Sequence, residues 1–494
     1  MIARPDLKLS ARLTPFCCFS NRHTMQEMKL PRRRLLRPLS LILIIGSLAQ
    51  AQLPKQDPKS LNNWTDENRA RMAAQVRAEF QHAWGGYQQF AWGHDELRPL
   101  SKTPRDWYSS TLLMTPVDAL DTMTLMGFDD EADTTRDYIA THLSFDRDIY
   151  VKNFEITIRL LGGLLSNYQL SHDQRLLVLA QDLGNRLLPA FNSPTGMPYV
   201  YVNLKTGATR GNISNPAEIG TLLLEFGTLS KLTGNPAYYD KAKRALVAVY
   251  QRRSPIGLVG TTINVDTGEW IDKTSHISGM IDSYYEYLLK ASILFADKDC
   301  ERMWKESIGA VNRYLGEEVR GGLWYGHVDM NTGKRVAPLY GALDAFFPAV
   351  LALSGDMDRA ARLQQSSHKM WELAGVEPEE LNYSSMKITD PPYALRPEII
   401  ESAYYLYFYT RDPKYLDMGK VYFDALKQYC RTDVAYAALK NVETKEKADA
   451  MESFFFAETM KYLYLLYAPR NAMDLTKTVF NTEAHPLQPV AAVP

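Results

Sequence analysis

The feature that most constrains this fold is a helical spacing of apolar residues that recurs from residue 66 almost to the end of the chain. Short turns such as 233–236 and 411–413, built from Gly, Asn, Asp and Pro, separate one apolar segment from the next. No linker rich in Pro, Ser or Gly divides the segments into separate domains. Helices are predicted at 68–84, 116–126, 154–168, 216–232, 238–251, 276–295, 300–315, 397–410, 413–429 and 448–468.

Strand-like segments are short. They cover residues 199–203, 257–263 and 324–329, and each precedes a Thr-Gly pair that is typical of a β-hairpin turn. The pattern therefore predicts an all-α domain whose helices are arranged in pairs, with short β-hairpins at the ends of the pairs. A closed α/α barrel is the natural form of such an array, although periodicity alone does not distinguish it from an open solenoid.

Residues 1–51 are typical of a secretory leader. A basic stretch at 29–37 precedes an apolar run at 39–48, and the following Ala-Gln-Ala fits the small-x-small rule for signal-peptide cleavage. Translation would start at Met25 or Met28, and cleavage would follow Ala51. We therefore expect a secreted or periplasmic protein. An uncleaved N-terminal anchor is the alternative, although the apolar run is short for a membrane span.

Charge and cysteine content narrow the list of partners. The full chain has a formal net charge of −1, and without residues 1–51 the charge becomes about −8 with no basic tract. Nucleic acid and anionic membrane are therefore poor candidates as partners. Only Cys300 and Cys430 lie outside the leader, which permits one disulfide but no disulfide framework. We expect the chain to be a monomer.

Carboxylates occur inside several of the apolar helices, where an unpaired buried charge costs several kcal/mol. An i,i+4 ion pair on a solvated face would explain any one of them, and Glu155 with Arg159 is the clearest such case. A barrel lumen lined by carboxylates explains them together. Glu218 and Glu225, seven residues apart, are expected on one face of a single helix. The six acids are Glu155, Glu218, Glu225, Asp282, Glu452 and Glu458.

The run Arg396-Pro397-Glu398 supplies a candidate base. Proline at the first helical position would place Glu398 in the first turn, next to a guanidinium. The helix dipole and Arg396 should hold the pKa of Glu398 low, so that the carboxylate stays ionised and can activate a water molecule. The alternative is an ordinary helix start with acidic residues near its N-terminus.

Seven segments of the chain form a pattern that occurs in this order in a known family. The segments lie at 117–127, 153–164, 224–234, 279–287 (Gly-Met-Ile-Asp-Ser-Tyr-Tyr-Glu-Tyr), 393–398 (Tyr-Ala-Leu-Arg-Pro-Glu), 452–465 and 480–486 (Phe-Asn-Thr-Glu-Ala-His-Pro). With them the chain resembles glycoside hydrolase family 47, the class I α-1,2-mannosidases that trim N-glycans in eukaryotes and have bacterial relatives. The resemblance extends from about residue 66 to 486, and the chain is most similar to a secreted bacterial member.

The resemblance implies a single catalytic domain at 52–494, folded as an (α/α)7 barrel, that inverts the anomeric carbon and holds one Ca²⁺ at the barrel floor. Glu155 would be the general acid, Glu398 the base that activates water, and Asp282 a third catalytic carboxylate. Thr482 would bind Ca²⁺ through its hydroxyl and carbonyl oxygens. The residues implied to contact the sugar or the calcium-bound waters are Arg159, Glu218, Glu379, Arg396, Phe454, Glu458 and Glu483.

The chemistry of the residues is compatible with this assignment. Inversion needs two carboxyls roughly 6.5–9.5 Å apart, and Glu155 and Glu398 come from distant segments. A hard, oxygen-ligated cation suits Glu and Thr, whereas the nine histidines show no zinc-binding spacing. The resulting hypothesis is a Ca²⁺-dependent exo-α-1,2-mannosidase that acts on mannose-containing oligosaccharides. A mannose-binding, lectin-like protein with the same barrel is the alternative.

One segment departs from the family pattern. Many members carry a histidine shortly before Phe-x-Pro-Gly, whereas residues 342–349 here read Ala-Leu-Asp-Ala-Phe-Phe-Pro-Ala. This form resembles the branch of the family associated with glycoprotein degradation, so it bears on substrate preference. His485, which lies close to Thr482, is expected to pack at a helix end.

Overall fold

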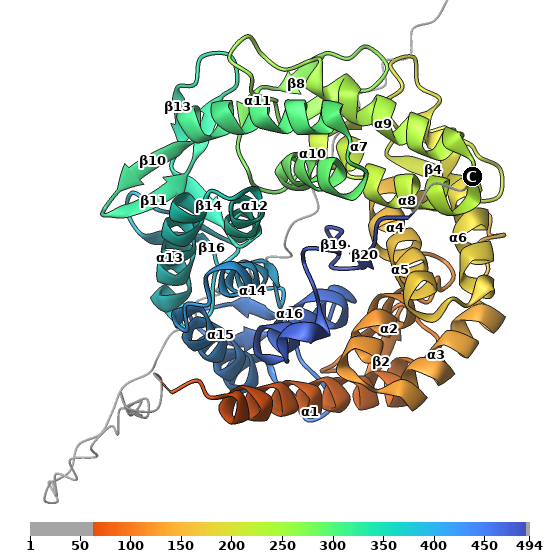
Figure 1. Ribbon diagram of the computed structural model, residues 1–494, viewed down its shortest axis with the longest axis vertical. Coiled ribbons are helices and arrows are strands. Elements are labelled where there is room, and N and C mark those ends of the chain that lie inside the picture. Colours follow the sequence, from red (N-terminus) through yellow and green to blue (C-terminus); the bar gives the residue numbers. More distant parts are fainter. Residues whose placement is uncertain (1–62, 491–494) are drawn as a thin grey trace, which may run out of the picture. The chain divides into compact units, whose positions relative to one another are not determined.

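The computed structural model describes residues 63–490, and these residues belong to one compact unit. The predicted leader at 1–51 lies outside the described residues. Within this unit, helices follow one another around a closed ring in which an inner helix alternates with an outer one (Figure 1). Seven such pairs make up the described ring, which is an (α/α)7 barrel as predicted.

The inner helices are α2 (Met114–Met126), α5 (Gly162–Ser171), α8 (Leu223–Thr233), α10 (Asp282–Leu294), α12 (Phe347–Ser354), α14 (Glu398–Thr410) and α16 (Met460–Tyr467). Their outer partners, in the same order, are α3 (Asp129–His142), α6 (Gln174–Leu187), α9 (Pro236–Tyr250), α11 (Lys298–Tyr314), α13 (Met357–Ala374), α15 (Lys414–Ala425) and α1 (Asp66–Ala91). Two short helices, α4 (Asn153–Ile156) and α7 (Pro216–Gly220), precede α5 and α8. Short 3₁₀-helices are η2 (Leu188–Phe191), η3 (Leu343–Phe346) and η6 (Arg470–Ala472). Short π-helical segments are η1 (Thr157–Leu161), η4 (Leu426–Cys430) and η5 (Phe455–Thr459).

The strands form small antiparallel sheets between helices. The two-stranded sheets are β1 (Glu96–Arg98) with β2 (Thr103–Arg105), β10 (Gly316–Val319) with β11 (Gly322–Tyr325), β17 (Leu439–Asn441) with β18 (Glu446–Lys447), and β19 (Val479–Phe480) with β20 (Pro486–Leu487). The three-stranded sheets are β3 (Tyr150–Lys152), β4 (Tyr201–Asn203) and β5 (Thr209–Arg210); β6 (Ile213–Ser214), β7 (Thr262–Asn264) and β8 (Trp270–Asp272); β13 (Arg335–Ala337), β12 (His327–Asp329) and β9 (Thr274–Ser275); and β14 (Leu339–Gly341), β15 (Glu380–Asn382) and β16 (Lys387–Asp390).

Burial explains why the two rings differ in sequence. An inner helix packs against neighbours on all sides, and almost every residue of α10 is buried. An outer helix covers only one face, so α11 buries a stripe that includes Cys300, Trp304, Ser307 and Val311 at helical spacing. Cys300 and Cys430 are both buried as free thiols.

Three predicted helices differ from the structure. The helix predicted at 216–232 is broken between α7 and α8, because Gly220 lets the Tyr284 ring approach the backbone and the Thr221 hydroxyl donates to Ser283 at 2.8 Å. Glu218 and Glu225 therefore lie on different helices. The helix predicted at 276–295 begins only at Asp282, after a left-handed Met280 (φ +75°), and the one predicted at 448–468 begins at residue 455.

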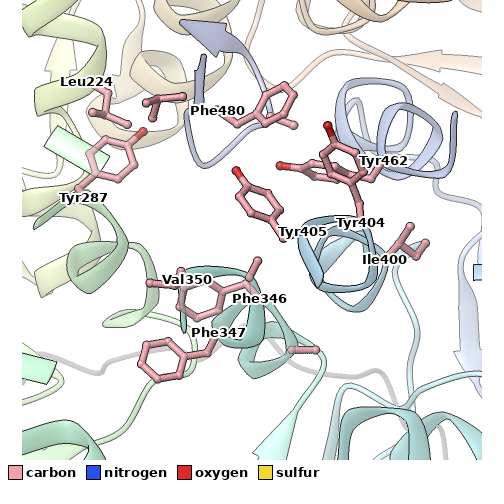
Figure 2. Packing of buried hydrophobic residues seen from close by; sticks show 14 of the residues in the cluster. Leu224, Tyr287, Phe346, Phe347, Val350, Ile400, Tyr404, Tyr405, Tyr462 and Phe480 are labelled. Carbon is pink, nitrogen blue, oxygen red and sulfur yellow. The ribbon is translucent and has the colours of Figure 1, made fainter. Parts of the chain in front are cut away.

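A short hairpin, β19–β20, enters the barrel and closes its interior (Figure 1). The Phe480 ring packs edge-on against Tyr462 of α16, with a centroid distance of 5.7 Å, among aromatic residues of the inner helices (Figure 2). The turn is held by Asn481, whose amide donates to the carbonyl of Ile158 at 2.9 Å and to Glu225 at 2.8 Å. These contacts position the turn, which carries Thr482 and Glu483.

Two glycines at the start of α5 make room for this hairpin. A Cβ at Gly162 would lie 2.5 Å from the Asn481 amide nitrogen, and a Cβ at Gly163 would lie 3.2 Å from the His485 ring. The Asn481 amide cannot retreat without losing its two buried hydrogen bonds. The Gly-Gly pair in the segment 153–164 is therefore a requirement of close packing.

This packing predicts that Gly162→Ala destabilises the protein by about 1–3 kcal/mol, the usual cost of overfilling a well-packed interior. The matched control is Gly85→Ala in α1, where a Cβ meets no atom within 4 Å. Because alanine is the better helix former, the control should gain about 0.5–1 kcal/mol. Denaturant unfolding of both variants measures the difference, and equal stabilities would contradict the role given to Gly162.

Candidate active site

The barrel interior contains a cavity of about 280 Å³ that is lined largely by charged side chains. Eight carboxyl residues and three basic residues face it, so acids exceed bases by five. The acids are Glu155, Glu218, Asp282, Glu286, Glu398, Glu401, Glu458 and Glu483, and the bases are Lys152, Arg159 and Arg396. Phe454 and Thr482 also line the cavity, whereas Glu225, Glu379 and Glu452 do not.

The three predicted catalytic carboxylates share one type of position. Glu398 is the first residue of α14, Asp282 is the first residue of α10, and Glu155 lies in the first turn of α4. Unpaired N–H groups at a helix start favour negative charge, so these positions suit carboxylates. The sequence thus brings Glu155, Asp282 and Glu398 into one cavity from three separate elements.

Arg396 lies near Glu398, as expected, and attracts its carboxyl electrostatically, but its hydrogen bonds go to a different acid. The guanidinium of Arg396 instead forms a two-pronged contact with Glu379, at 2.5 Å from Nη2 to Oε1 and 3.2 Å from Nε to Oε2. Glu379 does not line the cavity itself, and through this contact it orients Arg396, which does. Arg396 also lies over the Phe454 ring, 5.9 Å from its centre.

The expectation of a low pKa for Glu398, in contrast, is wrong. Burial raises the pKa of Glu398 to about 7, and the opposing attraction of Arg396 is too weak to reverse this effect. Its Oε2 atom is buried and has no hydrogen-bond partner among the described residues. Burial likewise raises the pKa of Asp282 to about 6, against two hydrogen bonds from Ser283. Both carboxyls therefore titrate near neutral pH in this structure.

Glu155 lies in an ionic network as well as at the cavity. The Arg159 guanidinium donates to Glu155 at 3.1 Å and also contacts Glu483 of the central hairpin. The guanidinium is held over the rings of Trp107 and Phe454 at 5.3 and 5.8 Å from their centres. The i,i+4 pair expected from the sequence is present, and it links the candidate acid to the hairpin.

Two deeper acids, Glu286 and Glu401, were not predicted as site residues. They lie four residues after Asp282 and three after Glu398, on the same helix faces, so helical spacing was the signal that could have revealed them. Glu286 pairs with Lys290, and Glu401 accepts a hydrogen bond from Tyr462 at 3.2 Å. Burial raises the pKa of Glu401 to about 8, although Lys290 opposes the shift.

Lys152 is a further site residue that sequence reasoning missed. Its ammonium lies 2.8 Å from Glu218 and 3.8 Å from Glu155, at the edge strand β3. Burial lowers the pKa of Lys152, but attraction by Glu218 and Glu155 outweighs burial and the pKa is raised. Lys152 therefore stays charged and ties two cavity acids together.

The residues around Thr482 fit a hard, hydrated cation. Thr482 faces the cavity from the hairpin turn, and its backbone N–H points to the Tyr287 hydroxyl at 3.3 Å. Buried neighbours such as Glu458 and Glu483 have raised pKa values, chiefly because they are buried. Within residues 63–490, no three His, Cys, Asp or Glu side chains converge as a direct metal cage. The excess of acidic over basic side chains fits a cation here, because a positive charge would reduce the repulsion between the carboxylates.

The run 342–349, which departs from the expected family pattern, borders the cavity only through apolar side chains. Leu343 and Phe346 line it, whereas Asp344 is buried behind them and accepts the Gly341 N–H at 2.8 Å. Burial raises the pKa of Asp344 to about 8. This carboxyl has a structural position in the turn at Gly341.

Comparison with known proteins identifies the same family. The model of glycosyl hydrolase family 47 matches residues 79–489. An α-mannosidase I of Arabidopsis thaliana is 40% identical over 83% of this chain and 68% of its own. The human ER degradation-enhancing α-mannosidase-like protein 2 is 36% identical over 92% and 84%. The solved α-1,2-mannosidase of Trichoderma reesei is 32% identical, with a TM-score of 0.79 over 85% of this chain and 99% of that one.

The acidic interior predicts a pH-dependent stability in the presence of a chelator. Glu401 faces Glu286 and Lys290 of α10, Glu398 of its own helix and Tyr462 of α16. Its raised pKa means that the folded state keeps a proton which the unfolded state releases above about pH 4.5. This proton stabilises the folded protein. Its contribution to the free energy of unfolding is fully present below about pH 4.5 and is lost as the pH rises to about 8.

Glu401→Gln should therefore lose less stability than the wild type between pH 5 and 8, by an amount of the order of 2 kcal/mol. Glutamine preserves the acceptor for Tyr462 but does not titrate. The exposed Glu443→Gln is the control and should follow the wild-type curve. Denaturant unfolding at several pH values measures this, and parallel curves for Glu401→Gln and the wild type would refute the assignment.

Proposed function

The chain belongs to glycosyl hydrolase family 47 and is an α-mannosidase, and from this premise we propose that it removes terminal α-1,2-linked mannose from glycans with inversion at the anomeric carbon. The observation that carries the proposal is the convergence of Glu155, Asp282 and Glu398 in one cavity. Because the three carboxyls come from three different helices, two of them can lie far enough apart to hold a sugar and a water molecule between them, as inversion requires.

We assign the general acid to Glu155 and the general base to Glu398. Glu155 would protonate the leaving-group oxygen, and Arg159, fixed over Trp107 and Phe454, holds its carboxyl in place. The unpartnered Oε2 of Glu398 is free to accept a proton from an attacking water. Asp282 faces the same cavity, and its repulsion adds a smaller contribution to the raised pKa of Glu398.

We propose Ca²⁺ as the cofactor, held by the hydroxyl and carbonyl oxygens of Thr482 together with water. When bound, Ca²⁺ can bind sugar hydroxyls, orient water and favour a distorted ring. The surrounding acids, Glu286, Glu401, Glu458 and Glu483, would hold the waters by hydrogen bonds. A cation in this position also favours ionised carboxylates nearby, which suits the base role of Glu398.

Secretion and a monomeric state are further parts of the proposal. Secretion rests on the leader-like sequence at 1–51, and the absence of a basic tract after it argues against nucleic acid or anionic membrane as a partner. In the part of the chain between residues 63 and 490, no helix is both long enough and apolar enough to cross a membrane.

Replacement of the base is the first test of this function. Glu398→Gln keeps the shape but cannot accept a proton, so kcat on an α-1,2-mannobiose should fall by about 10²–10⁴ while mannose binding persists. Glu443→Gln, an exposed substitution, should leave kcat unchanged. Wild-type turnover by Glu398→Gln would transfer the base role to another cavity acid, with Asp282 first.

Metal dependence is the second test. Exhaustive chelation should abolish release of mannose from the disaccharide, and Ca²⁺ should restore it better than Zn²⁺, because the site offers oxygen ligands. Thr482→Val removes the hydroxyl and should raise the Ca²⁺ concentration needed for half-maximal activity. Full activity in chelator would refute the cofactor, and an absence of turnover with every metal would favour the lectin-like alternative.

A further inference from the structure

A strip of side chains leads away from the cavity along the sheet β3–β4–β5. The register pairs Lys152 with Tyr201 and Tyr201 with Arg210, so these three residues lie side by side on adjacent strands. Alternation places Tyr150 on the same face, while Val151 and Val202 pair on the opposite face and are buried in the core. We call the face formed by Tyr150, Lys152, Tyr201 and Arg210 the outer strip.

The outer strip is continuous with the catalytic cavity. Lys152 lines the cavity and contacts both Glu218 and Glu155, the candidate acid. Arg210 lies two strands further on, and neighbouring strands are about 4.8 Å apart, so the backbone positions of Lys152 and Arg210 are separated by roughly 10 Å. A sugar bound beside Glu155 could not reach Arg210, but the next units of the same glycan could.

Arg210 is held in a defined position although it is exposed. Its guanidinium lies over the Tyr150 ring at 4.2 Å and over the Tyr201 ring at 5.1 Å from the ring centres. Contact with two rings restrains the guanidinium and lowers the entropy that binding would cost. No described residue accepts a hydrogen bond from its N–H donors. A fork of donors with this geometry matches a pair of neighbouring hydroxyls on a sugar ring.

We propose that the outer strip is a binding surface for neutral sugar units on the leaving-group side of the scissile bond, with Arg210 as its main hydrogen-bond donor. This proposal rests on the proposed function, because it takes Glu155 as the end of the site that faces the leaving group. It makes the protein selective for oligosaccharides over disaccharides. Tyr150 and Tyr201 act by positioning Arg210.

The test compares two substrates with one variant. Arg210→Ala should lower kcat/KM for a branched high-mannose oligosaccharide by about 10- to 100-fold, the loss expected for hydrogen bonds from a charged group. It should change kcat/KM for an α-1,2-mannobiose by less than about twofold, because the disaccharide does not extend as far as Arg210. Arg210→Lys should behave nearly like alanine, since an ammonium lacks the planar fork. Equal effects on both substrates, or none on either, would overturn the proposal.

Arg313→Ala is the matched control. Arg313 is an exposed arginine over a half-buried tyrosine, 5.2 Å from the centre of the Tyr314 ring, on the outer helix α11 and away from the cavity. It should leave both substrates and the melting temperature unchanged. A loss on the oligosaccharide equal to that of Arg210→Ala would show that any surface arginine has this effect, and the outer strip would lose its role.

A binding measurement separates this proposal from the proposed function. In a Glu398→Gln background, calorimetric titration with the oligosaccharide should give a Kd that Arg210→Ala raises by about 10- to 100-fold. This change in Kd tests the binding role of Arg210 even if the wild type releases no mannose. Added NaCl should change the Kd little, since the ligand is neutral; a steep salt dependence would indicate an anionic ligand and overturn the assignment.

Discussion

The buried contact between His485 and two aspartates is the interaction on which the site depends. The imidazole lies between Asp121 Oδ2, at 2.7 Å from Nδ1, and Asp118 Oδ1, at 3.2 Å from Nε2, with all three side chains fully buried. Burial lowers the pKa of His485, but the two carboxylates outweigh it and raise the pKa to about 9. His485 is therefore charged, and it fastens the central hairpin to α2. Its ring also packs against Gly162 and Gly163 at the start of α5, which agrees with the expected packing at a helix end.

Lys461 completes this anchor from another side of the barrel. Its ammonium lies 2.8 Å from Asp121 and donates to the carbonyl of Ala484 at 2.6 Å. Burial raises the pKa of Asp121, but Lys461 and His485 reverse that effect and lower it to about 2. Such a network gains little net stability over an apolar core, because removing each charge from water is costly. Its effect is geometric, since the hairpin that carries Thr482 can bind the barrel in only one position.

The fixed hairpin stands beside an interior that is strongly acidic. Carboxyls at the starts of α10 and α14 face further acids one turn deeper, and burial pushes the pKa values of Asp282, Glu398 and Glu401 upward. A site of this kind stores electrostatic strain that a cation or a proton relieves. The excess of negative charge therefore favours a bound cation, and the charge of such a cation would lower the pKa values of these carboxyls again.

The sequence predicted those parts of the structure that depend on local pattern. Helical spacing located six of the seven inner helices, and the position of Glu398 at the start of α14 followed from Pro397. It missed α12, whose eight residues are too few and too uniformly apolar to show a period. The outer helices α3, α6 and α13 were not predicted, since their exposed faces dilute the apolar signal. The hydrogen bonds of Arg396 were missed because their acceptor, Glu379, lies 17 residues earlier in a different segment of the chain. Burial, which sets the pKa of Glu398, is likewise a property of the assembled barrel.

The most direct test of this account is the configuration of the sugar first released. Glu155 and Glu398 are assigned as acid and base on either side of a water molecule, so proton NMR during hydrolysis of an α-1,2-mannobiose should show β-mannose before mutarotation. This result requires attack by water from the face opposite the leaving group, which is the arrangement proposed for the cavity. Initial release of α-mannose would contradict it, because retention requires one of these carboxylates to act as a nucleophile.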